Sequence, residues 1–274
     1  VMALGYILIA LVVMAVNYEQ IPSMFYLIID SAFFGQAGFG AIVGLAIQWG
    51  VKRGIYSNEA GQGTAPHAAA AAEVSHPAKQ GLVQAFSVYI DTLFVCTATA
   101  FMILLTGLYN VEGPDGVMLY TGLAGVEAGP IYVQSAFETI LPGLGASLLA
   151  ISLFFFAFTT ILAYYYIAET NVMFINRKTQ RPWLMIFLKW LVLSSVMYGG
   201  IKSADLAWAL GDVGVGAMAW LNIVAILILQ RPALLTLKDY EAQLKAGEAP
   251  EFNSDVLGIK NANFWTKSRA DSSD

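Results

Sequence analysis

Residues 33–42 read FFGQAGFGAI and interrupt an apolar segment that runs from residue 21 to residue 51. Three glycines fall within this short stretch, at positions 35, 38 and 40. Glycine adopts backbone conformations that other residues avoid, so the stretch predicts a break between two half-helices, residues 22–34 and 41–51. Such a break is unusual in lipid, where each unpaired N–H or C=O group costs several kcal/mol. It is tolerated where the freed backbone lines a cavity or binds a ligand.

The composition is that of a membrane protein. Of the 274 residues, 58% are hydrophobic and 12% are charged, whereas soluble domains contain about 25% charged residues. The apolar runs are long and continuous, which indicates an all-α polytopic protein and not a β-barrel. The net charge of −5 is not typical of a nucleic-acid-binding protein. The single cysteine, Cys96, lies in an apolar run, so no disulfide framework is expected within the chain.

About 20 apolar residues are needed to cross a bilayer as a helix, and the sequence offers six such spans. The predicted spans are residues 1–17, 22–51, 82–108, 143–174, 182–201 and 210–229, the second being the broken one. The transmembrane region is therefore residues 1–230. Residues 109–141 are expected to form a long loop with short surface helices. Residues 231–274 are expected to form a tail, with a short interfacial helix at 234–244 and a disordered end.

The first residues, Val1 and Met2, already lie in an apolar stretch with no charged region before it, so no signal peptide is expected. We expect instead that an N-terminal portion of the protein is missing. Lysines and arginines predict the orientation, because they favour the cytoplasmic side. They gather in the loops after the second and fourth spans and after the sixth span, at positions 52, 53, 79, 177, 178, 181, 231 and 238. These loops and the C-terminus are expected to be cytoplasmic, in a cell inner or plasma membrane.

A broken helix exposes carbonyl groups at the end of one half and N–H groups at the start of the next. The carbonyls suit Na⁺, and the N–H end suits a carboxylate. Discontinuous helices of this kind are typical of secondary transporters, so the break predicts transport. The alternative is that the glycines serve only helix packing, as in small-xxx-small interfaces.

Polar residues inside the other spans are further candidates. Thr159 and Thr160 lie in the middle of the fourth span, where hydroxyls can bind Na⁺ or can hydrogen-bond to their own helix. Asp91 lies in the third span, and an ionisable residue inside a membrane span is a functional candidate by default.

Residues 50–77 are polar for a membrane protein and contain His67, Glu73 and His76. The spacing of these three does not match the HExxH zinc motif. A membrane enzyme that uses them is the least favoured alternative, and no enzymatic activity is expected.

Two stretches carry a resemblance to a known family. Residues 50–81 read GVKRGIYSNEAGQGTAPHAAAAAEVSHPAKQG, and residues 90–107 read IDTLFVCTATAFMILLTG. Together they resemble the signature region of the alanine/glycine:cation symporters, over residues 1–231. The resemblance implies a leucine-transporter-like fold of two inverted five-helix repeats, in which these six spans would be helices five to ten. It also implies sodium-coupled symport of alanine or glycine, with Na⁺ as the coupling ion and no other cofactor.

The resemblance also implies roles for individual residues. Gly38 and Phe39 would contact the substrate next to Gly40, and Phe33 would act as an aromatic lid. Gln36 stands where a relative has a small hydroxyl residue. The implied Na⁺ ligands are Thr159 and Thr160, with Asp91 as a further one.

Two alternatives stay open. The break of helix six could lie at residues 57–61, although that would place Lys52 and Arg53 in the membrane at roughly 2.5–3.5 kcal/mol each. The protein could also be a proton- or sodium-coupled carrier of another solute with Asp91 as the proton site, or a structural membrane subunit.

Overall fold

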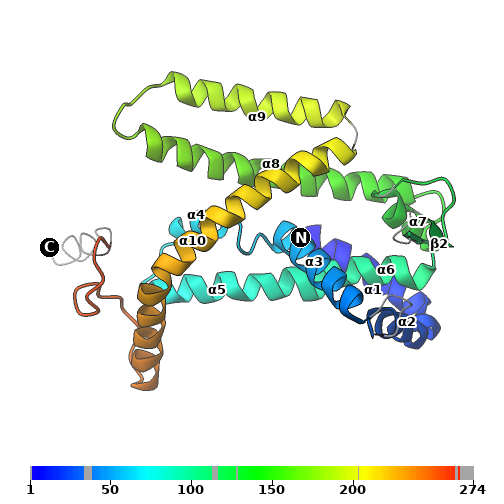
Figure 1. Ribbon diagram of the computed structural model, residues 1–274, viewed down its shortest axis with the longest axis horizontal. Coiled ribbons are helices and arrows are strands. Elements are labelled where there is room, and N and C mark those ends of the chain that lie inside the picture. Colours follow the sequence, from blue (N-terminus) through cyan, green and yellow to red (C-terminus); the bar gives the residue numbers. More distant parts are fainter. Residues whose placement is uncertain are drawn as a thin grey trace. The chain divides into compact units, whose positions relative to one another are not determined.

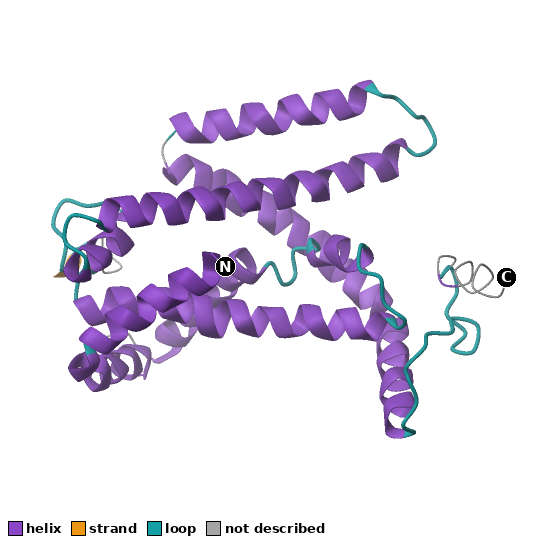
Figure 2. Cartoon of the chain, turned by 180° about the vertical axis from the view of Figure 1, so that it is seen from behind, coloured by secondary structure: helices purple, strands orange, loops and turns teal. Residues whose placement is uncertain are grey.

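The computed structural model describes residues 2–33, 39–112, 117–127, 129–202, 204–262 and 265, and the side chains of residues 2–3, 31–47 and 204–205 lie outside this description. The described chain is mainly helical (Figures 1 and 2). The helices before the hairpin are α1 (Met2–Val16), η1 (Tyr18–Gln20), α2 (Ile21–Phe33), α3 (Phe39–Asn58), α4 (Ala65–Ala70), α5 (Pro77–Ile90), η2 (Asp91–Cys96) and α6 (Thr97–Thr106). A hairpin of β1 (Asn110–Glu112) and β2 (Met118–Thr121) follows, then α7 (Ile131–Ile140), α8 (Gly145–Asn176), α9 (Trp183–Ile201) and α10 (Ala204–Lys245).

The chain divides into two compact units, and each is described here by itself. The first contains Val1–Asn58 and Tyr89–Trp208, and the second contains Glu59–Val88 and Ala209–Asp274. In the first unit, α8 and α9 run side by side as an antiparallel pair (Figures 1 and 2). In the second unit, the end of α10 and the chain after it pack on the residues that precede α5.

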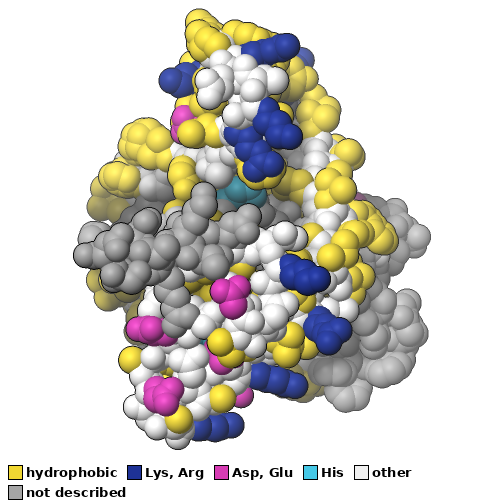
Figure 3. All heavy atoms as spheres, turned by 90° about the vertical axis from the view of Figure 1, so that its left-hand side faces the viewer, with side chains coloured by type: hydrophobic (Ala, Val, Ile, Leu, Met, Phe, Trp, Pro, Cys, Tyr) yellow, Lys and Arg dark blue, Asp and Glu magenta, His cyan; other side chains and the backbone are white. Residues whose placement is uncertain are grey.

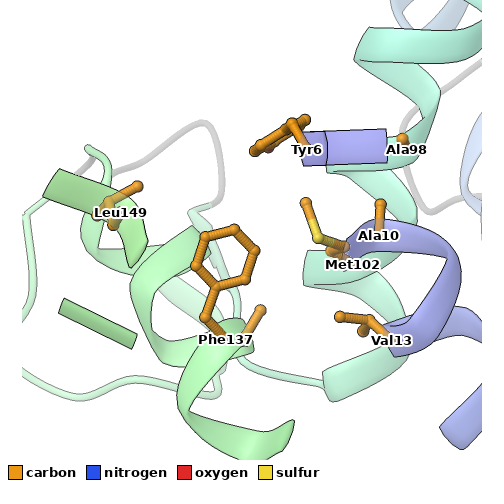
Figure 4. Close-up of a cluster of buried hydrophobic side chains, with 8 residues drawn as sticks. Tyr6, Ala10, Val13, Ala98, Met102, Phe137 and Leu149 are labelled. Atoms are coloured by element: carbon orange, nitrogen blue, oxygen red, sulfur yellow. The ribbon is translucent and has the colours of Figure 1, made fainter. Parts of the chain in front are cut away.

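The core of the first unit lies where α1, α6, α7 and α8 meet (Figure 4). Tyr6, Ala10 and Val13 of α1 recur at helical spacing and are buried on one face. They pack against Met102 of α6 and Phe137 of α7, both almost completely buried. This cluster fixes the position of the helix that carries Asp91, because η2 continues directly into α6.

Four helical segments are long and apolar enough to cross a membrane among the described residues. They are Pro77–Thr106, Gly145–Asn176, Trp183–Ile201 and Leu206–Lys245. A fifth is possible if Leu4–Val16 and Tyr18–Asp30 form one span, but these two helices meet at 77°. The third to sixth predicted spans are confirmed, and the third and the sixth are longer than predicted. At the first predicted span, α1 has 15 residues and a sharp bend separates it from α2. The predicted second span, residues 22–51, includes residues outside the description, so the described residues show four or five of the six predicted spans.

Most side chains on these helices are apolar and exposed, as expected of surfaces that face lipid or other membrane helices. In Figure 3 basic side chains lie in both the upper and the lower part of the face shown. The turn that joins α8 to α9 contains Arg177, Lys178 and Arg181. The protein is therefore a multi-pass membrane protein.

The predicted loop at residues 109–141 contains a β-hairpin as well as the expected short helix. Asn110 pairs with Thr121 and Val111 with Tyr120, and the register shifts between Val111 and Glu112. The hairpin packs tightly on the end of α6, since a Cβ at Gly122 would lie 2.2 Å from the Gly107 carbonyl oxygen. The sequence analysis missed this hairpin because its strands are only three and four residues long.

The C-terminal part also differs from its prediction. No separate interfacial helix forms at residues 234–244, because α10 continues through Pro232 to Lys245. Residues 246–262 do not form a disordered end, since Phe252 and Ser254 are buried there. The predicted boundary between membrane region and tail, at residues 230 and 231, lies inside α10.

Candidate functional site

The helix interruption that the structure describes lies after α3. This helix ends at Asn58, seven residues beyond the predicted end at Val51, and α4 begins at Ala65. Between them Glu59, Gly61 and Gly63 have φ angles of 56°, 93° and 89°. Residues that carry a side chain rarely adopt such positive φ angles, and a right-handed helix requires negative ones. The backbone there therefore cannot continue a right-handed helix. The break at residues 57–61, which the sequence analysis set aside, therefore exists as a helix end.

The objection to that break was the charge on Lys52 and Arg53. In the structure Lys52 Nζ lies 5.0 Å from the centre of the Trp49 ring, and Arg53 Cζ lies 4.8 Å from that of Trp208. Cations over indole rings gain electrostatic stabilisation, which offsets part of the cost of leaving water. Sequence reasoning could not supply this, because Trp208 is far from Arg53 along the chain.

The end of α3 contacts η2 through a set of polar side chains, here called the polar cluster: Ser57, Asn58, Asp91, Thr92 and Cys96. The Ser57 hydroxyl donates to Oδ2 of Asp91 at 2.5 Å and lies 2.9 Å from the Cys96 sulfur. Asn58 Nδ2 donates to the Thr92 hydroxyl at 3.1 Å. Both residues at the α3 terminus therefore bond to the first turn of η2.

The local backbone at Asp91 is a π-helix that spans Asp91–Cys96 inside an otherwise α-helical segment. Its wider turn lets the Thr97 hydroxyl donate to the Thr92 carbonyl, five residues back, at 3.1 Å. Single π-turns inside α-helices often occur at functional sites, because they disturb the regular hydrogen bonding. The turn contributes the Asp91 carboxylate and the Thr92 hydroxyl to the polar cluster, and α3 adds the Ser57 hydroxyl. Hard cations take such oxygen ligands.

The chain after the interruption belongs to the second unit and is fixed to α10. Asn222 of α10 donates to the Gly61 carbonyl at 3.0 Å and packs against Gly63, where an added Cβ would lie 3.2 Å from its Cγ. Thr64 follows and is 4% exposed. Its hydroxyl has no hydrogen-bond partner within the described residues. A buried orphan hydroxyl of this kind can serve a ligand.

Thr159 and Thr160 lie in the middle of α8, as predicted, and are exposed. Thr159 donates to the carbonyls of Phe155 and Phe156 at 2.9 and 3.1 Å, and Thr160 donates to the Phe156 carbonyl at 2.8 Å. Their hydroxyl hydrogens are thus used within the helix. No hydrogen bond within the described part of the chain links either residue to Asp91.

The predicted substrate residues fall around the gap between α2 and α3. Phe33 ends α2, and Phe39 and Gly40 begin α3, but their side chains lie outside the described residues. Gln36 and Gly38 lie outside them altogether, as do residues 35–38 of the predicted break, whereas its last two residues, Phe39 and Gly40, are helical. The roles of these residues remain predictions.

The alternative set of His67, Glu73 and His76 does not form a common site. His67 Nδ1 lies 3.3 Å from the Thr64 carbonyl, whereas His76 Nε2 lies 3.2 Å from Oδ2 of Asp239. Within the described residues no three His, Cys, Asp or Glu side chains are grouped so that they could hold a metal ion.

Four members of the polar cluster were missed as candidates: Ser57, Asn58, Thr92 and Cys96. Ser57 and Asn58 belonged to the break that was set aside, and Thr92 and Cys96 were read as ordinary span residues. A signal existed in residues 90–97, IDTLFVCT, which places three polar side chains and a thiol in one apolar span.

The model of the sodium:alanine symporter family matches residues 1–254. YrbD of Bacillus subtilis is 60% identical over 266 residues, which cover 97% of this chain and 55% of the relative. The sodium/proton-dependent alanine carrier protein of Bacillus sp. (strain PS3) is 56% identical over 265 residues, which cover 96% of this chain and 60% of the relative.

The sodium/alanine symporter AgcS of Methanococcus maripaludis is 39% identical over 229 residues, which cover 83% of this chain and 47% of the relative. The chain thus spans about half the length of the curated relatives that it matches. The family match covers nearly the whole chain and is one of transporters, not of enzymes. The chain belongs to the sodium:alanine symporter family.

Proposed function

We propose that the complete protein is a sodium-coupled symporter of a small neutral amino acid, alanine or glycine. The observation that carries the proposal is the polar cluster, in which Asp91 and Ser57 meet at 2.5 Å between a helix end and a π-turn. A carboxylate inside a membrane span is costly and is retained where it serves an ion or proton path. Relatives named as alanine carriers support the substrate class.

In this proposal Na⁺ binds between α3 and η2. The Asp91 carboxylate then contacts the ion in place of the hydrogen bond that it now accepts from the Ser57 hydroxyl. Binding of the ion would hold the end of α3 against η2. Thr159 and Thr160 would bind a second ion through their hydroxyl oxygens. Alternating access would then follow from movement of the interrupted helix relative to the rest.

The substrate residues follow the sequence analysis. Phe33, Gln36, Gly38, Phe39 and Gly40 would line the amino-acid site, with Phe33 as its lid. A substrate carboxylate would bind to the backbone N–H groups at the start of α3.

The proposed orientation keeps the C-terminus in the cytoplasm. The loop before α5 was predicted to lie on the same side as the C-terminal tail. Contacts of Ser75 and His76 with the end of α10 and the following segment support that pairing.

The test is uptake of labelled alanine by the complete protein in lipid vesicles, with and without a Na⁺ gradient. We expect accumulation only with the gradient, and glycine should compete with alanine. Uptake that ignores Na⁺ would contradict the proposal.

A second candidate is proton coupling through Asp91, favoured by the short hydrogen bond from Ser57 and by a relative named as sodium/proton-dependent. Uptake measured under a proton gradient without Na⁺ distinguishes proton coupling from sodium coupling. Uptake under that condition, lost in Asp91→Asn, would favour the proton.

A further inference from the structure

The chain after α10 turns back onto the residues that precede α5. At the centre of this contact lies His76, which is 0% exposed. Its Nδ1 accepts the backbone N–H of Ala78 at 3.2 Å, so the ring proton is on Nε2. Nε2 then donates to Oδ2 of Asp239 in α10 at 3.2 Å. His76 therefore joins the start of α5 to α10 with a fixed donor and a fixed acceptor.

Aromatic rings close over this imidazole. The Tyr240 ring lies 5.1 Å from it and the Phe252 ring 5.5 Å, measured between ring centres. Phe252 belongs to the segment after α10 and is 7% exposed. Its burial shows that the segment is packed and not merely adjacent.

Gln243 ties the same segment to α10. Its side-chain amide donates to the Glu251 carbonyl at 3.0 Å and accepts the Glu251 N–H at 2.9 Å. The amide also donates to Asp239 at 2.8 Å. One side chain thus satisfies both backbone groups of Glu251, as a neighbouring β-strand would.

Ser75 supplies the opposing contacts from the turn that joins α4 to α5. Its hydroxyl donates to the Pro250 carbonyl at 2.8 Å, and its carbonyl accepts the Phe252 N–H at 3.1 Å. The segment 250–252 is therefore held on one side by α10 and on the other by this turn.

A second anchor reaches α4 itself. Trp265 lies 5.2 Å from the Phe252 ring. It lines an apolar cavity of about 670 Å³ together with Ala65 and Ala69 of α4 and Gly81 of α5. Trp265 thus lines one cavity together with both helices that flank the turn.

We propose that residues 246–262 form a C-terminal clasp that restrains the turn between α4 and α5 and must open during the transport cycle. α4 begins directly after the helix interruption, so a segment that holds this turn to α10 also limits the movement of α4. The clasp acts as an autoinhibitory contact. The proposal rests on the proposed transport function, since uptake is one readout, but the state of the clasp has a readout of its own.

The first experiment closes the clasp covalently. Ser75→Cys and Pro250→Cys are combined in the complete protein, because the Ser75 hydroxyl lies 2.8 Å from the Pro250 carbonyl oxygen. Oxidation should lower Na⁺-driven alanine uptake several-fold, and a reductant should restore it. Each single cysteine variant is the control, because neither can form this bond. Unchanged uptake with the disulfide formed would overturn the proposal.

The second experiment releases the clasp. Gln243→Ala, alone and with Phe252→Ala, should expose the segment to trypsin at Lys245 and Lys260 and raise the initial uptake rate. Val256→Ala is the matched control, because Val256 lies in the same segment with its side chain 77% exposed. Faster cleavage without faster uptake would overturn the autoinhibitory role. Cleavage at the wild-type rate in both release variants would overturn the clasp itself, even if the protein transports nothing.

Discussion

The Ser57 hydroxyl lies 2.5 Å from the Asp91 carboxylate, although the two residues are 34 positions apart. One stands at the end of α3 and the other at the first position of a π-turn. Two irregular points of the backbone thus meet through their side chains. This contact is where the proposed coupling of transport to an ion can be tested most directly.

Asp91→Asn should raise the Na⁺ concentration for half-maximal alanine uptake by roughly tenfold, equal to about 1.4 kcal/mol of ion binding, because a neutral amide attracts the cation less than a carboxylate does. Ser57→Ala should give a smaller shift, since it removes a neutral ligand. Na⁺ titration of uptake measures both. Ser87→Ala is the control, because among the described residues the Ser87 hydroxyl bonds within α5 alone, to the Gln84 carbonyl. An unchanged Na⁺ dependence of uptake in both variants would show that the polar cluster does not bind the coupling ion.

Thr159→Ala and Thr160→Ala should each raise the half-maximal Na⁺ concentration several-fold, because each removes a hydroxyl oxygen from the middle of α8. The helix should tolerate the loss, since both hydroxyls bond only to carbonyls of their own helix. Ser195→Ala in α9 is the matched control, as its hydroxyl also bonds to its own helix, at Leu191. If all three variants behave like the wild type, these threonines are not sodium ligands.

Gly38→Val should abolish alanine uptake while the protein still inserts into the membrane. A branched side chain at this position would fill the space that the predicted substrate occupies. Membrane fractionation and uptake are measured on the same vesicles. Retained uptake would place the amino-acid site elsewhere, with the interruption at 59–64 as the next candidate.

Gly122→Ala should destabilise the hairpin after α6 by about 1–3 kcal/mol, because the new methyl group would meet the Gly107 carbonyl and force the backbone to shift. Thermal unfolding of the detergent-solubilised protein measures the change. Gly129→Ala is the comparison, since an added Cβ there has open space around it. Equal unfolding temperatures for the two variants would contradict the packing described for this hairpin.

The sequence predicted the helical class and the four long spans because continuous apolar runs leave no other structure that satisfies the backbone in lipid. It also identified Asp91, since a carboxylate in such a run is conspicuous. It did not predict the partner of Asp91. Ser57 was placed in a cytoplasmic segment, because the cost of Lys52 and Arg53 in lipid was counted without the tryptophan rings that lie against them.

Other features depend on contacts that no local pattern encodes. The π-turn at Asp91–Cys96 has the same residue types as an ordinary helix, so composition could not reveal it. The ordered segment after α10 was read as disordered from its polarity. It is ordered because Gln243 and Ser75, 168 positions apart (243 − 75), both bond to it.

α10 has 42 residues, which at 1.5 Å per residue is about 63 Å, roughly twice the thickness of the hydrocarbon layer. Its last 13 residues follow Pro232, where one helical hydrogen bond is lost. The helix is therefore expected to bend most easily near Pro232, and the part after it moves as a rigid segment. A tilt of about 10° there would displace its far end by about 3 Å, the length of a hydrogen bond. A small rotation within the bilayer is thus enough to break a polar contact well outside it.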